Sequence, residues 1–357
     1  MISRRFLLKA GMAGVAAVTA PAVISRAQAL PKSIRIAGGV NFAQGQLQLT
    51  GYAAIIEHQG WLAAELNKRG VALEPFAVSH KATGPQINEG FANRSLEFAS
   101  YGDLPTIICN ANGVQTRLLV PNGMGGSGDT FLVVPAGSTA KDVTDLKGKR
   151  IAVHRGRPWE IPFFRLLAAR GLSPSDFTIL NIDPMTGAAA VSAGKIDGLF
   201  TMTDAYLLEE KGVARILWSS KGQGPEWKMR TEMFGRKDFI ESQPELTQLV
   251  VTAYVKAAHW ASDPANKEKY LEFQGRTGTP RSVLNRTYDE QGDAWRQRWA
   301  PLFAPDIAER YQDTVQYALD NKLIRQRIDA ASLLAPAFAG KALKDLGLEG
   351  YWRTASI

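Results

Sequence analysis

The 357-residue chain is poor in the residues that build disulfides and metal sites. It contains one cysteine, Cys109, and four histidines. A single cysteine cannot form a disulfide within the chain, so hydrophobic cores must hold the fold together. The histidines lie apart in sequence, with no cysteine companion and no close acid pair at metal-ligand spacing, so we expect no metal site.

Motifs of common enzyme classes are missing as well. No Gly-x-Ser-x-Gly motif occurs, and Cys109 lies in the apolar stretch 106–110, where we expect a buried, inert thiol. The glycine-rich run 123–128 lacks the Lys-Ser/Thr ending of a phosphate-binding loop, and a mobile connector is its simpler interpretation. These absences favour a protein that is not an enzyme and has no cofactor.

Long blocks of one charge are also absent. The formal net charge is +8, but the first 29 residues carry Arg4, Arg5, Lys9 and Arg26 and no acid, which leaves the rest near +4. The remaining basic residues are scattered among acids, so nothing predicts nucleic-acid binding.

The N-terminus has the pattern of a twin-arginine export signal. Residues Ser3-Arg4-Arg5-Phe6-Leu7-Leu8-Lys9 precede an Ala/Gly/Val stretch, and Ala27-Gln28-Ala29 is a small-x-small cleavage site. The apolar stretch is interrupted by Pro21 and is shorter than the ~20 residues of a spanning helix, so a permanent anchor is the less favoured alternative. With no cysteine in the leader for lipidation, we expect a freely diffusing periplasmic protein that begins at Leu30.

From residue 33 onward, short β-branched runs alternate with amphipathic stretches, which predicts parallel sheets covered by helices. Helices are predicted at 55–66, 87–92, 159–170 and 188–193, and mostly helical structure from 244 onward. The predicted strands are 34–37, 71–78, 98–101, 130–134, 151–153, 177–182 and 198–201.

Two segments indicate that the chain contains two similar units. Residues 93–99 and 192–199 share one pattern of helix end, turn, acid and buried strand. We therefore predict an α/β protein of two Rossmann-like lobes joined by two crossing strands near 128–134 and 229–234. Residues 30–128 and 230–357 form lobe 1 and residues 129–229 form lobe 2. Ligands of open α/β sheets bind beyond the carboxyl ends of the strands, which places a cleft between the lobes.

Five motifs in order carry a family resemblance. They are Gly102-Asp103-Leu104-Pro105, Gly137-Ser138-Thr139, Asp145 to Val153, Gly171 to Asp176, and Ala193 to Gly198. With this set the chain resembles the solute-binding proteins of ABC importers in the aliphatic sulfonate, taurine and nitrate group, which have the type II periplasmic binding fold. The resemblance implies a monomer that closes two lobes on a small molecule and delivers it to a permease and ATPase complex. A periplasmic sensor subunit, or an enzyme related to pyrimidine-precursor synthesis, are the alternatives.

Loops that follow strands supply the candidate ligand-binding residues, because backbone amides and helix amino ends are free there. The loop 155–160 is the strongest candidate, since it joins a strand to a helix and has Pro158 where a first helical turn accepts it. Relatives commonly carry a Gly-Ser type turn at 156–157 and a Trp-x-Pro type segment near 203–205, and this chain has neither. Trp159 or Trp227 could supply the aromatic wall that the missing tryptophan would provide. The predicted ligand-binding residues are Asn41, His80, Asp103, Arg155, Gly156, Arg157, Trp159, Glu160, Asp204 and Trp227.

Two of these residues have simpler interpretations. Arg157 and Glu160 could pair with each other at the helix start, and Asp103 could cap the helix that follows it. If Asp103, Glu160 and Asp204 face the cleft, a simple inorganic anion would gain little from them, because a carboxylate near an anion costs energy. The hypothesis is therefore a small sulfonate- or nitrogen-containing ligand, close to taurine or an alkanesulfonate. The loop 38–50 either closes over the cleft or packs on its rim.

Overall fold

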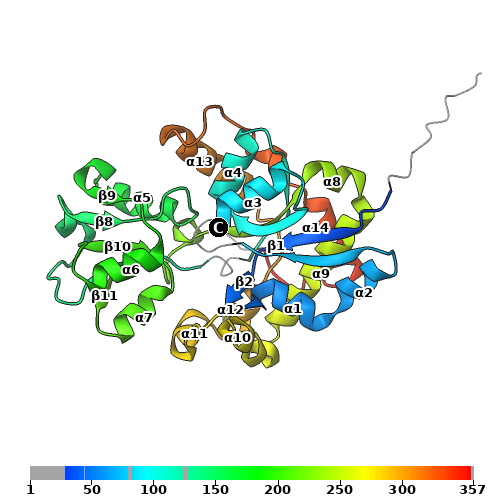
Figure 1. The fold of residues 1–357 in the computed structure, drawn as a ribbon, viewed down its shortest axis with the longest axis horizontal. Helices are drawn as coiled ribbons and strands as arrows, with labels where there is room; N and C mark the ends of the chain where they lie inside the picture. Colours follow the sequence, from blue (N-terminus) through cyan, green and yellow to red (C-terminus); the bar gives the residue numbers. More distant parts are fainter. Residues whose placement is uncertain (1–28, 44, 79–82, 124–127, 355–357) are drawn as a thin grey trace, which may run out of the picture.

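A computed structural model describes residues 29–43, 45–78, 83–123 and 128–354. The predicted export signal and His80 lie outside these described residues. Figure 1 shows two bodies side by side, one built around each of two five-stranded sheets. The predicted two-lobed α/β class is confirmed, while the predicted boundaries at residues 128 and 229 stay predictions.

The sheet of lobe 1 combines strands from two distant parts of the chain. In spatial order its strands are β4 (Ala72–Phe76), β1 (Ser33–Ala37), β5 (Phe98–Gly102), β12 (Thr231–Arg236) and β6 (Thr116–Val120). Strand β1 is parallel to its neighbours β4 and β5, whereas β12 is antiparallel to both of its neighbours.

The sheet of lobe 2 repeats this plan with strands from one stretch of sequence. Here β7 is the antiparallel strand, paired on both sides. The spatial order is β11 (Ala214–Ser219), β7 (Phe131–Pro135), β10 (Gly198–Thr201), β8 (Arg150–Ala152) and β9 (Thr178–Leu180). Each antiparallel strand directly follows a crossing between lobes, so the crossing chain enters each sheet against the direction of its parallel strands.

The two crossing segments are tied to each other. Lys228 Nζ lies 2.8 Å from Asp129 Oδ1, and Ser220 Oγ donates to the same oxygen at 3.2 Å. Lys228 and Asp129 are both mostly shielded from water, so this pair is less screened than a surface pair. The segments therefore form one connected hinge.

Helices cover both sheets. Lobe 1 carries α1 (Gly51–Gln59), α2 (Trp61–Asn67), α3 (Thr83–Ala92), α4 (Asp103–Ala111), α8 (Lys237–Ser242), α9 (Pro244–Ser262), α10 (Lys267–Gly275), α11 (Arg281–Thr287), α12 (Gly292–Gln297), α13 (Ile307–Asp320) and α14 (Pro336–Asp345). Lobe 2 carries α5 (Glu160–Ala169), α6 (Pro184–Ser192) and α7 (Asp204–Glu210). Among the described residues, no helix is both long and apolar enough to cross a bilayer.

Two parts of the predicted pattern needed correction. The helix predicted at 55–66 is two helices, because Gly60 adopts a left-handed φ of 65° that ends α1. The loop 38–50 contains a hairpin of β2 (Val40–Ala43) and β3 (Gln46–Leu49), which the sequence interpretation did not include. Phe42 on this hairpin is 70% exposed.

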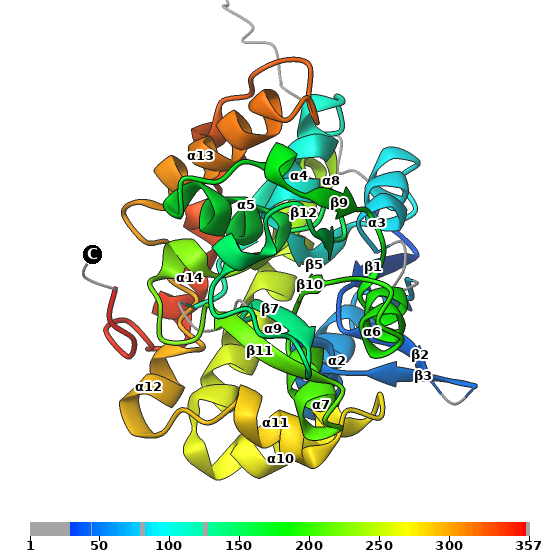
Figure 2. The same ribbon diagram turned by 90° about the vertical axis from the view of Figure 1, so that its left-hand side faces the viewer.

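The lobes also touch on two flanks, which Figure 2 shows with lobe 2 in front. On one flank α7 faces α11, where Ser282 Oγ donates to Glu210 at 2.7 Å and Arg286 pairs with Glu209 at 2.7 Å. On the other flank α5 faces α13, where the Tyr317 hydroxyl donates to Glu160 at 2.9 Å. Both flanks are thus joined by side-chain contacts in this conformation.

Candidate functional site

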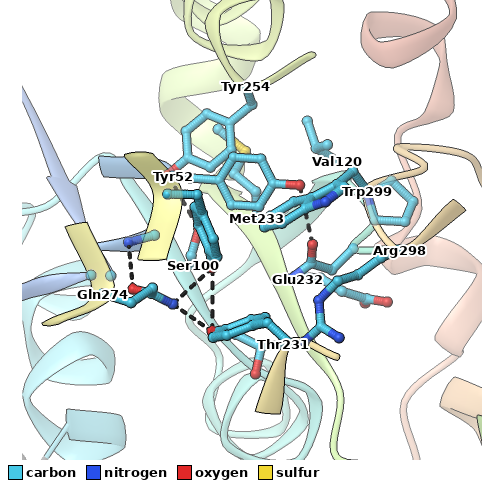
Figure 3. Close-up of a pocket in the computed structure, with 17 residues that line it drawn as sticks. Tyr52, Ser100, Val120, Thr231, Glu232, Met233, Tyr254, Gln274, Arg298 and Trp299 are labelled. Carbon is cyan, nitrogen blue, oxygen red and sulfur yellow. Dashed lines mark hydrogen bonds between the residues drawn. The ribbon is translucent and has the colours of Figure 1, made fainter. Parts of the chain in front are cut away.

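A cavity of ≈ 200 Å³ lies at the edge of the lobe 1 sheet, beside the hinge. We call it the sheet-edge cavity, and Figure 3 shows its lining. Its lining residues are Gly38, Gly39, Gly51, Tyr52, Ser100, Val120, Pro121, Asn122, Thr231, Glu232, Met233, Tyr254, Tyr270, Gln274, Tyr288, Arg298 and Trp299.

The position of this cavity follows from the sheet. Gly38 directly follows β1 and Asn122 comes shortly after β6, so both lie beyond the carboxyl ends of their strands, where open α/β sheets bind ligands. Gly38 has a φ of 105°, and a Cβ there would lie 2.6 Å from the carbonyl oxygen of Ser100. Glycine is therefore required for the chain to turn this closely against β5.

Aromatic rings form most of the walls. Tyr52 stacks on Tyr254 at 5.5 Å between ring centroids and meets Trp299 edge-on at 5.9 Å. Tyr270 makes edge-on contacts with Trp299 at 4.8 Å and with Tyr288 at 5.2 Å. Because these rings brace one another, the walls are a preformed apolar surface.

Gln274 fixes the hydroxyl groups of this wall. Its Nε2 donates to the hydroxyls of Tyr270 at 2.7 Å and Tyr288 at 2.6 Å, while its Oε1 accepts from the backbone amide of Gly51 at 3.0 Å. On the far side, the Tyr52 hydroxyl donates to Asn122 Oδ1 at 3.3 Å. The tyrosines are thus held by hydrogen bonds as well as by packing.

Two residues at the cavity, Trp299 and Arg298, have hydrogen-bond donor groups that no described residue uses. The indole Nε1 of Trp299 is buried without a partner, and Trp299 is 3% exposed. Arg298 is 8% exposed and uses Nη1 on Glu290, so its Nε and Nη2 groups keep their donor capacity. Figure 3 shows its side chain reaching towards the middle of the lining residues. A buried donor without an acceptor costs free energy that a bound acceptor would recover.

Glu232 is an acidic residue of the cavity lining, but its carboxylate is turned to the other face of the sheet. Side chains alternate along β12, so Met233 lies on the cavity side, whereas Glu232 bonds Tyr311 and Arg230 behind the sheet. Glu232 therefore contributes no free carboxylate oxygen to the cavity. Near that pair, burial is the main factor that raises the pKa of Asp103 to about 7, although Arg230 opposes the rise.

Of the predicted ligand-binding residues that the structure describes, none lines the sheet-edge cavity. The groups of the 155–160 loop bond mainly to one another. Glu160 is fully buried, and it accepts from Arg155 Nε, from the Gly156 amide and from the Tyr317 hydroxyl. The basic residue that the structure pairs with Glu160 is thus Arg155, and the predicted pairing of Arg157 with Glu160 stays a prediction.

Other residues of this loop touch lobe 1. The side chain of Pro158 lies against Gly102, and Arg157 Nη1 lies 3.2 Å from where a Cβ on Gly84 would be. Arg157 is buried, and this burial lowers its pKa. Trp159 is near Arg157, and its buried Nε1 has no acceptor among the described residues. The loop thus carries one unsatisfied donor where the lobes meet, so a ligand role for it stays a prediction.

The remaining predicted residues are spread over the molecule. Asn41 lies on β2 and donates to Thr50 at 3.2 Å, and Trp227 packs on Trp218 in lobe 2 at 5.7 Å. Asp204 accepts from the Thr201 hydroxyl at 2.7 Å and from the Met202 amide, and burial raises its pKa. All three have structural partners, and their ligand roles stay predictions.

Asp103 lines a second cavity of ≈ 470 Å³ between the lobes, which we call the interlobe cavity. Pro158 and Phe164 line its lobe 2 side, and Arg310 and Tyr317 of α13 line its lobe 1 side. Asp103 accepts from the amide of Leu104 at 2.7 Å and from Thr314 at 3.4 Å. The N-cap of α4 is Gly102 and no side chain caps this helix, so the interpretation of Asp103 as a helix cap is wrong; Asp103 is instead the first residue of α4.

The thiol has no part in either cavity. Cys109 on α4 is 3% exposed, and burial raises its pKa to about 12. It lies in a hydrophobic cluster with Tyr101 and Phe234. Within the described ranges, no group of three or more His, Cys, Asp or Glu side chains could hold a metal ion.

Sequence reasoning missed the cavity because its walls come from segments that are far apart in the chain. Tyr270, Gln274, Tyr288, Arg298 and Trp299 all belong to the C-terminal part, which the sequence analysis described only as mostly helical. One signal was available, because Gly38-Gly39 directly follows the first strand. A glycine pair at that point indicates close approach of the backbone to another group.

Comparisons with known proteins agree with this architecture. The NMT1/THI5 like family model matches residues 128–267. A putative aliphatic sulfonates-binding protein of Bacillus subtilis is 25% identical over 82% of this chain and 84% of its own length. The taurine-binding periplasmic protein of Escherichia coli is 28% identical over 66% of this chain and 74% of its own length.

A solved structure gives a stronger match. The putative periplasmic sulfonate-binding protein SsuA of a sulfonate ABC transporter from Methylobacillus flagellatus is 42% identical, with a TM-score of 0.81 over 91% of this chain and 98% of that one. The desulfurization enzyme DszB has a TM-score of 0.64 at 16% identity, which shows a shared fold. With the high identity of the first match over nearly its full length, the chain belongs to the family of periplasmic sulfonate-binding proteins of ABC transporters.

Proposed function

We propose that this chain is the periplasmic solute-binding component of an ABC importer and that its ligand is a small organosulfonate held in the sheet-edge cavity. One observation carries the proposal. The buried indole N–H of Trp299 has no acceptor among the described residues, and Arg298 has donor groups that its bond to Glu290 does not use, beside a wall of aromatic rings. A sulfonate has three acceptor oxygens and an organic part, so it matches donors at one end and rings at the other.

Charge favours an anion in this cavity. Arg298 is its only cationic lining residue within the described part of the chain, and Glu290 uses one of its nitrogens. The remaining nitrogens can form charge-assisted hydrogen bonds, which are about twice as strong as neutral ones. An anion with several acceptor atoms would gain most from them.

Closure of the lobes completes the binding step in this proposal. In the closed arrangement the 155–160 loop lies against lobe 1, with Arg157 beside Gly84 and Pro158 beside Gly102. A ligand shifts the population towards closure by contacts that exist only in the closed form. The loop therefore acts as the lobe 2 side of the closure.

The remaining parts of the functional proposal concern export and delivery. The twin-arginine leader would take the folded chain to the periplasm, with cleavage after Ala29. The mature protein would work as a monomer that hands its ligand to a permease and ATPase complex. The named relatives are binding proteins, which supports this role.

A binding role is favoured over catalysis for a chemical reason. The fold is shared with a desulfurization enzyme, so conversion of the ligand is the competing function. Cys109 is the single thiol of the chain and is buried outside the cavity, which removes a thiol nucleophile from this site. The protein should therefore release its ligand unchanged, which mass spectrometry after prolonged incubation checks.

Calorimetry on the mature protein tests the proposal. Methanesulfonate, 1-propanesulfonate and benzenesulfonate are titrated alongside nitrate and acetate, each with wild type and Arg298→Gln. We expect at least one sulfonate to bind, and Arg298→Gln to weaken it by about 10- to 100-fold, because a charge-assisted bond contributes about 1.5–3 kcal/mol. Glu290→Gln is the matched control, since it removes the partner of Arg298 and leaves its donors in place. Binding of nitrate with no sulfonate binding would overturn the proposal.

A further inference from the structure

We infer that the organic part of the ligand is a single uncharged ring, so that the preferred ligand is an arenesulfonate of benzenesulfonate size. This inference rests on the proposed function, because it assumes that the sulfonate group binds in the sheet-edge cavity. It is carried by three properties of that cavity: its volume, the charges on its lining and the arrangement of its rings.

Volume sets the size of the organic part. The sheet-edge cavity measures ≈ 200 Å³. An engineered apolar cavity of about 150 Å³ in another protein holds a benzene molecule, so one ring fits here with space left for a sulfonate group. Two fused or linked rings would exceed this space, whereas the short chain of taurine would leave much of the wall uncovered.

The charges on the lining disfavour a cationic organic part. Arg298 supplies a positive charge, and Glu232, the single acidic lining residue in the described part of the chain, has its carboxylate bonded to Arg230 and Tyr311 behind the sheet. An ammonium group in the cavity would meet no free carboxylate and would repel Arg298. Burying a charge without a partner is costly, so a neutral organic part binds better.

The rings could in principle hold a cation on their faces, but those faces are partly in use. Arg298 lies over the face of Tyr288 at 4.7 Å, and Tyr52 covers one face of Tyr254. A cation–π contact contributes about 0.5–2 kcal/mol, and a second cation beside Arg298 would lose part of this to repulsion. A neutral ring instead gains edge-on and stacked contacts with Tyr52, Tyr270 and Trp299.

Matched ligands test the inference on the mature wild-type protein. Taurine and 1-propanesulfonate have nearly the same shape and differ by one charge, whereas cyclohexanesulfonate matches benzenesulfonate in size without an aromatic ring. We expect benzenesulfonate to bind at least about tenfold more tightly than taurine, with the affinity of 1-propanesulfonate between these two. Benzenesulfonate should also bind more tightly than biphenyl-4-sulfonate. Cyclohexanesulfonate should bind more weakly than benzenesulfonate.

Asn122→Asp adds the missing carboxylate with almost no change in shape. Asn122 lines the cavity and accepts from the Tyr52 hydroxyl, which a carboxylate can also do. The ratio of the taurine and 1-propanesulfonate dissociation constants should move towards taurine by about fivefold or more. A ratio measured on one protein is insensitive to a general loss of folding. Tyr351→Phe, a change outside the cavity, should leave this ratio unchanged.

The outcomes separate this inference from the proposed function. If no sulfonate binds, the proposed function fails. If sulfonates bind but taurine is as tight as benzenesulfonate, or biphenyl-4-sulfonate is the tightest, the proposed function stands and the inference is overturned. An unchanged ratio in Asn122→Asp would also overturn it, because the organic part would then not lie beside Asn122.

Discussion

The 155–160 loop of lobe 2 and the sheet-edge cavity of lobe 1 differ in how their polar groups are satisfied. Glu160 is fully buried, yet its oxygens accept bonds from Arg155, Gly156 and Tyr317. At the cavity, the buried Trp299 indole N–H has no acceptor among the described residues, and Arg298 has donor groups that Glu290 does not use. The loop contains the more conspicuous charges, but the cavity contains the groups that a ligand would satisfy.

This difference shows what a charged sequence motif can and cannot indicate. Arg155-Gly156-Arg157-Pro158-Trp159-Glu160 suggests a ligand site because its charges are dense. In the structure Glu160 pairs with Arg155 within the loop and accepts a hydrogen bond from Tyr317 of α13. Unsatisfied donors next to a cavity are a stronger sign of binding than charge density.

The largest expected effect concerns Asp103, which lines the interlobe cavity together with Pro158 of the loop. Its folded pKa of about 7 is above the value of about 3.9 for an exposed aspartate. Between about pH 4 and pH 7 the folded state therefore binds more protons than the unfolded state, so stability falls as pH rises through this window. Asp103→Asn should remove this dependence and raise the free energy of unfolding at pH 8 by about 2–4 kcal/mol.

Urea denaturation of both proteins at pH 4.5, 6 and 8 measures this difference. Asp313→Asn, which changes another acidic residue that lines the interlobe cavity, should keep the wild-type pH dependence. Parallel curves for wild type and Asp103→Asn would contradict the proposed burial of an ionisable Asp103.

Glu160→Ala tests whether the loop is a structural unit. Its removal leaves the Gly156 amide and the Tyr317 hydroxyl without their acceptor and unpairs Arg155. We expect the free energy of unfolding to fall by about 2–4 kcal/mol, because buried partners lose their bonds. Denaturation measures this loss, and Tyr317→Phe, which removes one bond and keeps the ring, should cost about 1 kcal/mol. If Glu160→Ala abolishes sulfonate binding without loss of stability, then the carboxylate acts on the ligand instead.

Much of the fold could be predicted because its signals are local. The strand at Ile34–Ala37 and the helix after Pro158 follow from β-branched runs, a helix-start proline and the left-handed Gly171. Gly60 was missed as a break, since an isolated glycine in an apolar pattern is compatible with a continuous helix until its φ is known. Strands β6 and β11 were missed because short apolar runs do not show by periodicity whether they are strands.

The site could be predicted much less well, because it depends on long-range contacts. The sequence correctly points to the carboxyl ends of the strands, but it does not show that α10 and the segment after α12 bring Gln274, Arg298 and Trp299 to that edge. It also does not show that β12 turns Glu232 away, although the alternation of side chains would follow once the strand is placed.

Trp299→Phe tests whether an unused donor of the sheet-edge cavity binds the ligand. The substitution keeps an aromatic wall and removes an indole N–H that has no acceptor among the described residues. Stability should change by less than about 1 kcal/mol, while sulfonate affinity should fall about three- to tenfold, the effect of one hydrogen bond. Trp295→Phe is a matched control, because its Nε1 is also buried without an acceptor but Trp295 does not line the cavity. Equal losses of affinity in both variants would mean that packing, not the donor, is responsible.

The smallest expected effect lies on the flank between α7 and α11, away from both regions. Arg286 pairs with Glu209 at 2.7 Å and with Glu210 at 3.8 Å, and its side chain is 38% exposed. Pairs exposed to this degree contribute about 0.5 kcal/mol, so Arg286→Met should scarcely change unfolding. These contacts nevertheless join the lobes, so their loss should favour the open form and weaken ligand binding by about twofold. Small-angle scattering without ligand should show a slightly larger radius of gyration, and high salt should abolish the difference from wild type because it screens the wild-type pairs. A large loss of affinity would instead mean that this flank, more than the 155–160 loop, holds the lobes closed.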